Sequence, residues 1–383
     1  MTIAGTGGGV GELPVTWLRA RTYRVPTATF GRAEPETDGT ARWEVTGVLV
    51  VQTGAADQTG LGFAYTDPCT LDLVRGTLTD QVLGHPALDT ARAFWSMAGA
   101  LRNTGWPGVA ASAISAVDIA LHDLSARLLG VPLTQLLGGA RSGVRGYGSG
   151  GFTSYSCAEL QRQLADWAGE GMTAVKMKVG SDPAADVVRV RAARQAIGDR
   201  VELFVDANGA YSRKQALGLA EQFTEFGVTW LEEPVSSDDL AGLRLIRDRG
   251  PAGMQIAAGE YGYTPPYFAA MLAAGAVDTL QADATRCGGV TGFLNAAAQA
   301  QAAGVPLSAH TAPALHAQLG AALPNVVHVE DFHDHRRIEA LLFDGVPVRR
   351  DGRIWPDRSR PGLGLDFKAA DAAPYLLAEW SSS

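Results

Sequence analysis

Eight short apolar runs alternate with amphipathic helical stretches in the second half of this chain, and this repeat constrains the fold more than any other feature. The runs predict β-strands at residues 144–149, 173–179, 201–206, 228–232, 255–260, 278–283, 306–310 and 326–330. Strands that alternate with helices indicate parallel βαβ units. Eight strands favour a TIM-like barrel over an open doubly wound sheet. No GxGxxG sequence follows any run, which argues against a dinucleotide-binding fold.

Seven of these runs carry a charged residue or a histidine at or near their C-terminal ends. The seven are Lys178, Asp206, Glu232, Glu260, Asp283, His310 and Glu330. In a barrel the C-terminal ends of the strands converge on one rim, where such folds place their active sites. Lys176 shares a strand face with Lys178, and Asn208 shares one with Asp206. Taken alone, the lysine pair would also fit an exposed edge strand whose charges oppose aggregation.

Three of these carboxylates, Asp206, Glu232 and Glu260, follow consecutive strands and form an all-oxygen ligand set. Oxygen ligands suit a hard divalent cation that keeps open positions for water or substrate. The sequence therefore predicts an Mg²⁺ site on the rim.

The remaining residues suit acid/base chemistry around such a metal. Lys178 is expected on one side of it and His310 on the other, with Asp283 fixing the tautomer of His310 and raising its basicity. Lys176 is expected to depress the pKa of Lys178 or to hold a substrate carboxylate. Glu330, if protonated, would hydrogen-bond a dianionic intermediate. This set predicts removal of a proton α to a carboxylate through an enediolate.

The chain resembles the enolase superfamily, in the mandelate racemase-like branch of the mandelate racemase/muconate lactonizing enzyme group. The matching segments are Ala113–Asp123, Leu136–Gly139, Lys176-x-Lys178, Val205–Tyr211, Trp230–Pro234, Ala258–Glu260, Asp283 before Gly288–Gly292, and Ser308–His310. The resemblance implies an α+β capping domain over a (β/α)7β barrel, Mg²⁺ on the three carboxylates, and acid/base roles for Lys178 and the His310–Asp283 pair. It also implies that Asn208 and Glu330 lie near the substrate and that the protein is a homo-oligomer.

The expected domain organisation follows from these segments. A Gly-rich mobile tail covers residues 1–11, the capping domain 12–138 and the barrel 139–345, and residues 346–383 return to the cap. Loops of the cap around Arg21–Gly31 and Gln52–Gly62 are expected to shape substrate specificity.

Charge and cysteine content exclude several other classes of protein. A net charge of -8 and a pI near 5.4 argue against a nucleic-acid-binding surface. No apolar run of membrane-spanning length and no signal peptide are recognised. The three cysteines have no CxxC spacing, so neither a disulfide framework nor a zinc site is expected. A reducing, cytoplasmic compartment is the natural inference.

A polar rim favours an acid-sugar dehydratase that forms a 2-keto-3-deoxy acid over an enzyme of aryl or alkyl acids. Its expected members are Asn208, Gln281, Ser308 and Arg286, of which Arg286 would suit a second carboxylate; Tyr147 is a further candidate for substrate contact. Alternatives are a racemase or epimerase of a 2-hydroxy acid and a cycloisomerase of a sugar-acid lactone, because all share the first proton transfer. A non-catalytic binding protein would require a lost base or ligand, and none is missing. The histidines His122, His333 and His335 are expected to serve packing or the surface.

Overall fold

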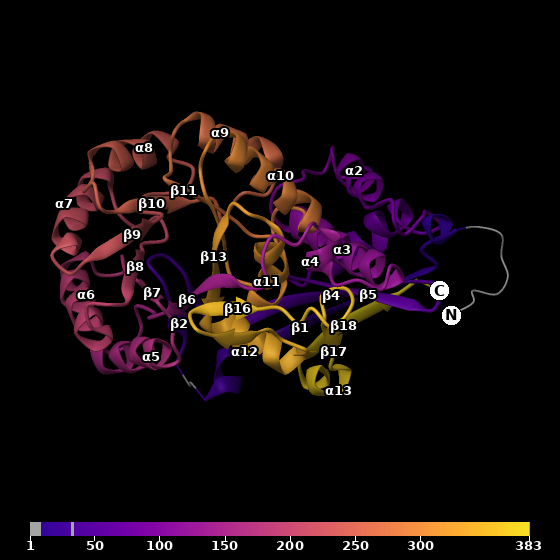
Figure 1. Cartoon of the computed structure of the whole chain (residues 1–383), viewed down its shortest axis with the longest axis horizontal. Coiled ribbons are helices and arrows are strands. Elements are labelled where there is room, and N and C mark those ends of the chain that lie inside the picture. The colour runs from indigo at the N-terminus through magenta and orange to yellow at the C-terminus, as the bar shows by residue number, and fades with distance from the viewer. Residues whose placement is uncertain (1–8, 32–33, 383) are drawn as a thin grey trace.

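The computed structural model describes residues 9–31 and 34–382, and eight parallel strands in it close into a barrel (Figure 1). The strands are β6 (Val144–Gly150), β7 (Ala174–Lys178), β8 (Glu202–Asp206), β9 (Val228–Glu232), β10 (Gln255–Ala258), β11 (Thr279–Ala282), β12 (Leu307–Ala309) and β13 (Val326–Phe332). The last strand pairs with the first, Glu330 opposite Tyr147, which closes the sheet. All eight predicted strands are confirmed, with ends shifted by at most two residues.

A helix follows every barrel strand and covers the outside of the sheet (Figure 1). The helices are α5 (Cys157–Gly169), α6 (Pro183–Ile197), α7 (Arg213–Thr224), α8 (Leu240–Arg249), α9 (Pro265–Ala273), α10 (Gly289–Ala302), α11 (Pro313–Ala322) and α12 (His333–Leu342). The expected (β/α)7β pattern therefore gains a helix after its eighth strand. Strand β7 is buried along its whole length, with Val175 and Met177 in the main apolar core and Lys176 among carboxylates of the interior.

The capping domain is a four-stranded antiparallel sheet packed against helices. Its strands, in spatial order, are β18 (Leu376–Ser381), β1 (Trp17–Pro26), β4 (Val45–Ala55) and β5 (Gln58–Tyr65). Its helices are α1 (Thr70–Leu73), α2 (Thr90–Ala100), α3 (Val109–Leu128) and α4 (Leu133–Leu136). The close approach of α3 to β5 depends on Gly62, where a Cβ would lie 2.1 Å from the carbonyl oxygen of Ala116. After α1 the chain passes through a π-helical turn (Val74–Leu78) and a 3-10 turn (Thr79–Gln81) before α2 begins.

The longest helix corrects one expectation about apolar segments. By length and composition α3 could cross a membrane, although no run of that kind was recognised in the sequence. Within the structure, however, 94% of its apolar window is buried, as in the core helix of a folded domain.

The C-terminal segment touches the barrel before it reaches the cap. A hairpin of β15 (Val348–Arg350) and β16 (Arg353–Trp355) pairs with β6, and β14 (Phe343–Asp344) pairs with β17 (Asp366–Phe367). After α13 (Ala369–Ala372), β18 pairs with β1 and so completes the cap sheet. Of the expected mobile tail, residues 1–8 lie outside the described residues, and Val10–Glu12 form a 3-10 turn.

A small hairpin of the cap lies directly on the barrel rim. Its strands are β2 (Glu36–Thr37) and β3 (Arg42–Trp43). At its tip the carbonyl oxygen of Asp38 accepts hydrogen bonds from Thr153 and Ser181, which follow β6 and β7. Gly39 packs so closely that a Cβ there would lie 2.3 Å from the carbonyl oxygen of Ala207. The hairpin therefore forms one wall of the space above the barrel.

Candidate active site

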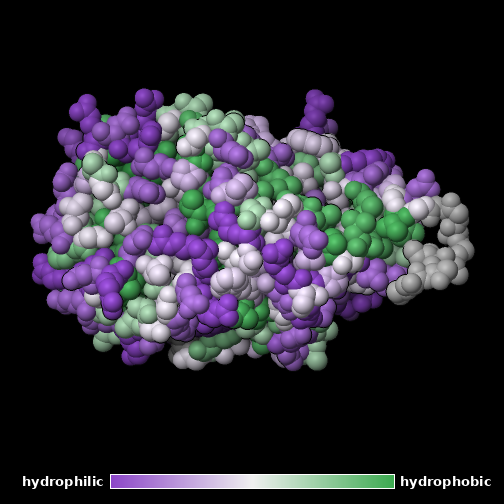
Figure 2. Space-filling view, viewed as in Figure 1, coloured by the Kyte–Doolittle hydropathy of each residue, from purple (hydrophilic) through white to green (hydrophobic). Residues whose placement is uncertain are grey.

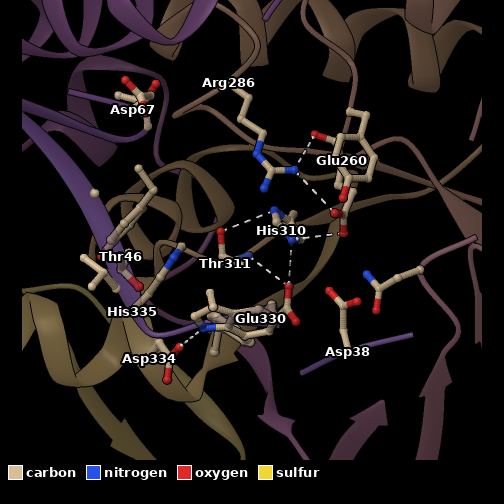
Figure 3. A pocket seen from close by; sticks show the side chains of 18 of the residues that line it. Asp38, Thr46, Asp67, Glu260, Arg286, His310, Thr311, Glu330, Asp334 and His335 are labelled. Atoms are coloured by element: carbon tan, nitrogen blue, oxygen red, sulfur yellow. Dashed lines mark hydrogen bonds and ion pairs between the residues drawn. The ribbon is translucent and has the colours of Figure 1, made fainter. Parts of the chain in front are cut away.

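A cavity of about 540 Å³ lies between the C-terminal rim of the barrel and the cap (Figure 3). The barrel contributes charged and polar side chains to it, among them Lys178, Asn208, Glu260, Arg286, His310, Glu330 and His335. The cap contributes Arg24, Asp38, Trp43, Thr46, Tyr65 and Asp67. The predicted active-site rim is thus the floor of a space whose roof is mostly polar.

Oxygen atoms of Asp206, Glu232 and Glu260 lie within 4.8 Å of one another, and all three residues are buried. Asp206 and Glu232 are opposite residues on β8 and β9. Glu260 is two residues beyond the end of β10 and reaches the cluster because Gly259 adopts a φ of 133°, a conformation that side chains oppose. Three buried carboxylates whose oxygens converge on one point offer the all-oxygen ligands that a hard divalent ion prefers, so the donor set agrees with the predicted Mg²⁺ site.

Both lysines of β7 point at these carboxylates. The ammonium of Lys176 lies 2.5 Å from Glu232 and 2.9 Å from Glu330, and it does not line the cavity. Contrary to expectation, it is not placed to bind a substrate carboxylate. Lys178 lines the cavity and lies 2.5 Å from Asp206.

The pKa of Lys178 was expected to fall below its ordinary value, and the structure gives the opposite direction. Burial is the largest single effect and lowers this pKa, as does the charge of Lys176, but the carboxylates of Asp206, Glu232 and Glu260 together raise the pKa above its ordinary value. The neighbouring lysine does act in the predicted sense. Its effect is outweighed because the cluster holds more carboxylates than ammonium groups.

His310 and Asp283 form the predicted pair, with Nδ1 2.9 Å from Asp283 Oδ2. The other ring nitrogen, Nε2, lies 3.0 Å from Glu260. Burial lowers the pKa of His310, but these two carboxylates raise it to about 9, so the ring is an imidazolium at neutral pH. The imidazolium can donate a proton.

Glu330 is held in its ionised form rather than the protonated one considered from the sequence. Burial raises its pKa, but Lys176 and then His310 lower it to about 2. The carboxylate accepts hydrogen bonds from the hydroxyl of Ser149 at 2.5 Å and the backbone N–H of Thr311 at 3.0 Å. Glu330 therefore acts as a buried anion that fixes Lys176.

Two of the three candidate substrate contacts line the cavity. Asn208 does so with a φ of 47°, while its backbone N–H donates to Asp206. Arg286 also lines it, but its guanidinium lies 3.3 Å from Glu260 and 3.7 Å from Asp283, so it is already paired with acid groups. Tyr147 is the exception: it packs fully buried in an aromatic cluster inside the barrel, beneath the rim, and does not reach the cavity.

Sequence reasoning missed the residues that the cap and the start of α12 bring to the cavity. The expected specificity segment Gln52–Gly62 is instead a β-hairpin turned toward α3, and of Arg21–Gly31 only Arg24 lines the cavity. His335, expected to serve packing or the surface, lines it too. Face alternation on β6 would have pointed to Ser149, two residues beyond Tyr147; no local signal marks the cap residues.

A second acidic cluster joins the hairpin to the barrel beside the cavity. Trp43 Nε1 donates to Asp334 Oδ2 at 3.0 Å, Tyr155 donates to Glu36 at 3.2 Å, and Arg337 bonds Asp334. Burial and the neighbouring Asp334 raise the pKa of Glu36 from 4.5 to about 8. Glu36 is therefore protonated at neutral pH and can share its proton with Asp334.

This cluster predicts a loss of stability in mildly alkaline solution. Between pH 4.5 and about 8 folded Glu36 keeps a proton that the unfolded chain releases, so the free energy of unfolding falls as pH rises through this window. Glu36→Gln keeps a hydrogen-bond donor and cannot ionise. We expect the variant to lose roughly 2 kcal/mol less than the wild type between pH 6 and 9. Thermal melts at both pH values test this, and equal losses in both proteins would contradict it.

Comparison with known proteins gives the same fold and the family that the sequence resembles. Residues 159–372 match the family described as enolase C-terminal domain-like, and residues 46–138 match the mandelate racemase/muconate lactonizing enzyme N-terminal domain. The chain is 29% identical over 365 residues to L-talarate/galactarate dehydratase of Salmonella typhimurium, covering 92% of this chain and 88% of that one. It is 33% identical to 3,6-anhydro-alpha-L-galactonate cycloisomerase of Streptomyces coelicolor, covering 92% and 97%.

Solved structures agree over nearly the whole length. A mandelate racemase/muconate lactonizing enzyme-like protein from Rubrobacter xylanophilus superposes with a TM-score of 0.92 at 49% identity, covering 95% of this chain and 100% of that one. The Salmonella typhimurium dehydratase with Mg and L-lyxarohydroxamate superposes with a TM-score of 0.88 at 26% identity, covering 100% and 97%. The chain therefore belongs to the mandelate racemase/muconate lactonizing enzyme group of the enolase superfamily.

Proposed function

We propose that this protein is an Mg²⁺-dependent acid-sugar dehydratase that converts an aldonate or aldarate into a 2-keto-3-deoxy acid. The observation that carries the proposal is His310, an imidazolium held by two carboxylates at the floor of a polar cavity. A protonated group in this place suits the departure of a hydroxyl group, because the leaving oxygen needs a proton. Asp206, Glu232 and Glu260 would hold the metal.

The residues divide the reaction between two sides of the site. When bound, a divalent cation would polarise the substrate carboxylate and offset the carboxylate charge that raises the pKa of Lys178, so that the amine could act as a base. Lys178 takes the α-proton, and His310 donates its Nε2 proton to the β-hydroxyl as the C–O bond breaks. Water leaves, and the remaining enol takes up a proton at carbon 3 to give the keto acid. Asp283 stabilises both charge states of His310 by holding Nδ1.

Similarity supports this reaction class and one alternative. Relatives described as D-gluconate dehydratase, from Thermoproteus tenax, and L-talarate/galactarate dehydratase, from Salmonella typhimurium, match over 67% and 92% of this chain. The alternative is a cycloisomerase, supported by the 33% identity to the Streptomyces coelicolor enzyme. An acid that delivers a proton to a ring oxygen would serve that reaction as well.

Turnover of a substrate panel tests the proposal. Incubating the protein with Mg²⁺ and a broad set of aldonates and aldarates is expected to give 2-keto acid, measured as the semicarbazone. The same incubation with sugar-acid lactones and anhydro acids measures cycloisomerisation. Formation of no keto acid from any aldonate or aldarate would contradict the dehydratase assignment, and turnover of a lactone or an anhydro acid alone would favour the alternative.

Removal of the metal is expected to abolish that turnover. Without a divalent cation, the buried carboxylates repel a substrate carboxylate, so activity should fall below detection after chelation with EDTA. Adding Mg²⁺ back should restore it. Activity that survives thorough chelation would contradict the proposed cofactor. Asp206→Asn provides a variant control, because it should remain inactive after Mg²⁺ is added back.

We also propose that the protein works in the cytoplasm as a homo-oligomer. All three cysteines are free, and two of them are exposed, which suits a reducing compartment. Assembly is supported by the exposed apolar side chains of Leu376 and Leu377 on β18, an edge strand of the cap sheet. Light scattering of the purified protein tests the oligomeric state.

A further inference from the structure

His335 is fixed in one orientation by contacts from both domains. Its ring stacks on Tyr65 of the cap, with centroids 3.3 Å apart and planes inclined by 9°. The edge of Phe332 at the end of β13 packs against it at 5.1 Å. The backbone N–H of Ala312, two residues after His310, donates to Nδ1 at 3.3 Å. These contacts leave the ring little freedom to turn.

The same contacts determine which ring nitrogen carries the proton. Nδ1 accepts a backbone N–H and is therefore unprotonated, which leaves the proton of the neutral ring on Nε2. Burial lowers the pKa of His335 to about 3, so the ring stays neutral over the working range of pH. Within residues 9–31 and 34–382, Nε2 has no hydrogen-bond partner, and the side chain lines the cavity.

We infer that His335 determines specificity by donating a hydrogen bond from Nε2 to an oxygen on the substrate chain beyond the reacting carbon. In Figure 3, His335 and Glu260 lie on either side of His310, so a substrate held by a metal at Glu260 and reacting beside His310 would extend toward His335. A substrate with a hydroxyl or carboxylate oxygen there satisfies the donor. A hydrocarbon chain leaves a polar group buried without a partner, which weakens binding.

This inference rests on the proposed function, because it assigns which part of an acid-sugar substrate the cavity recognises by a hydrogen bond. It also gives the cap a part in selectivity, because Tyr65 of the cap stacks on His335 and so orients this barrel residue. Because the N–H at Nε2 has a fixed direction, His335 is expected to recognise an oxygen on one carbon of the substrate chain and in one configuration at that carbon.

Two substitutions separate the proposed role from a structural one. His335→Asn can keep the acceptor for the N–H of Ala312 but removes the donor at the Nε2 position. His335→Gln can place an amide N–H near the Nε2 position but gives up the acceptor at Nδ1. A purely structural role at Nδ1 predicts that the asparagine variant is the milder of the two. The inference predicts that it is the one that loses substrate discrimination.

The experiment measures binding by calorimetry in Mg²⁺-loaded protein that also carries Lys178→Ala, so that no turnover occurs. The probes are the hexonate or hexarate that binds most tightly and its monodeoxy analogues at carbons 3, 4 and 5. We expect one analogue to bind about 10- to 100-fold more weakly than the parent. His335→Asn should reduce this ratio to near one, and His335→Gln should retain most of it. Melting temperatures check that each variant is folded.

Other outcomes overturn the inference. If all three analogues bind as tightly as the parent, no hydroxyl group on the chain is recognised. If the His335→Asn protein shows the same ratio of affinities as the protein with His335, another residue recognises the hydroxyl group. If discrimination through His335 is present but the native protein forms no keto acid, the proposed dehydration fails and the inference stands. If no acid sugar binds at all, both are wrong.

Discussion

Replacing Lys178 by alanine is expected to lower kcat roughly 10³-fold, while the protein remains folded and still binds Mg²⁺. The reason is the position of its ammonium, the only lysine amine on the cavity surface among the described residues, which lies 2.5 Å from Asp206. Alanine leaves no other base on that side. Because Asp206 keeps the hydrogen bond from the N–H of Asn208 and the charge of Lys176, it is not left without partners.

Three measurements make this prediction specific. Turnover of the best acid sugar gives kcat, circular dichroism and thermal melts report folding, and added alkylamines test for rescue of the missing base. Lys214→Ala provides a matched control, because Lys214 is exposed on α7 and should leave kcat unchanged. A Lys178→Ala protein that retains near-native turnover would remove Lys178 from the mechanism.

The barrel and its acid/base residues could be predicted because each depends on local pattern. Strand alternation with helices fixed the order of the eight strands, and each strand end carries its polar residue to the same rim. Glu260 is an instructive exception, because simple alternation would not bring it inward. Gly259, the residue before it, turns the chain so that Glu260 points inward. Glu260 was included among the predicted metal ligands only because it ends a predicted strand, as Asp206 and Glu232 do.

The cap side of the site could not be predicted because it depends on contacts between distant segments. Trp43 reaches Asp334 across 291 positions of sequence, and Tyr65 stacks on His335 across a similar distance. Neither pair has a local signature. The predicted direction of the Lys178 pKa was wrong for the same reason. This pKa depends on how many carboxylates surround the amine, and a motif of two lysines does not reveal that number.

Replacing His310 by asparagine is expected to abolish dehydration while preserving part of the first proton transfer. Asparagine can still bond Asp283 but cannot donate a proton to the leaving hydroxyl, so keto acid formation should fall roughly 10³-fold. Lys178 remains in place on the other side of the site. It can remove the α-proton, exchange it with solvent and return a deuteron. Substrate incubated in D₂O should therefore gain deuterium at the α-carbon without forming product.

Mass spectrometry of recovered substrate and the semicarbazone assay measure the two events separately. Loss of both exchange and dehydration in a folded His310→Asn protein would mean that His310, not Lys178, removes the proton, and the roles would be reversed. Retained dehydration would mean that another acid serves the hydroxyl. Asp283→Asn gives the matched intermediate case, because His310 then loses one of the two carboxylates that raise its pKa and keeps the other, Glu260. Dehydration should then fall while deuterium exchange persists, because proton removal and hydroxyl departure depend on opposite sides of the cavity.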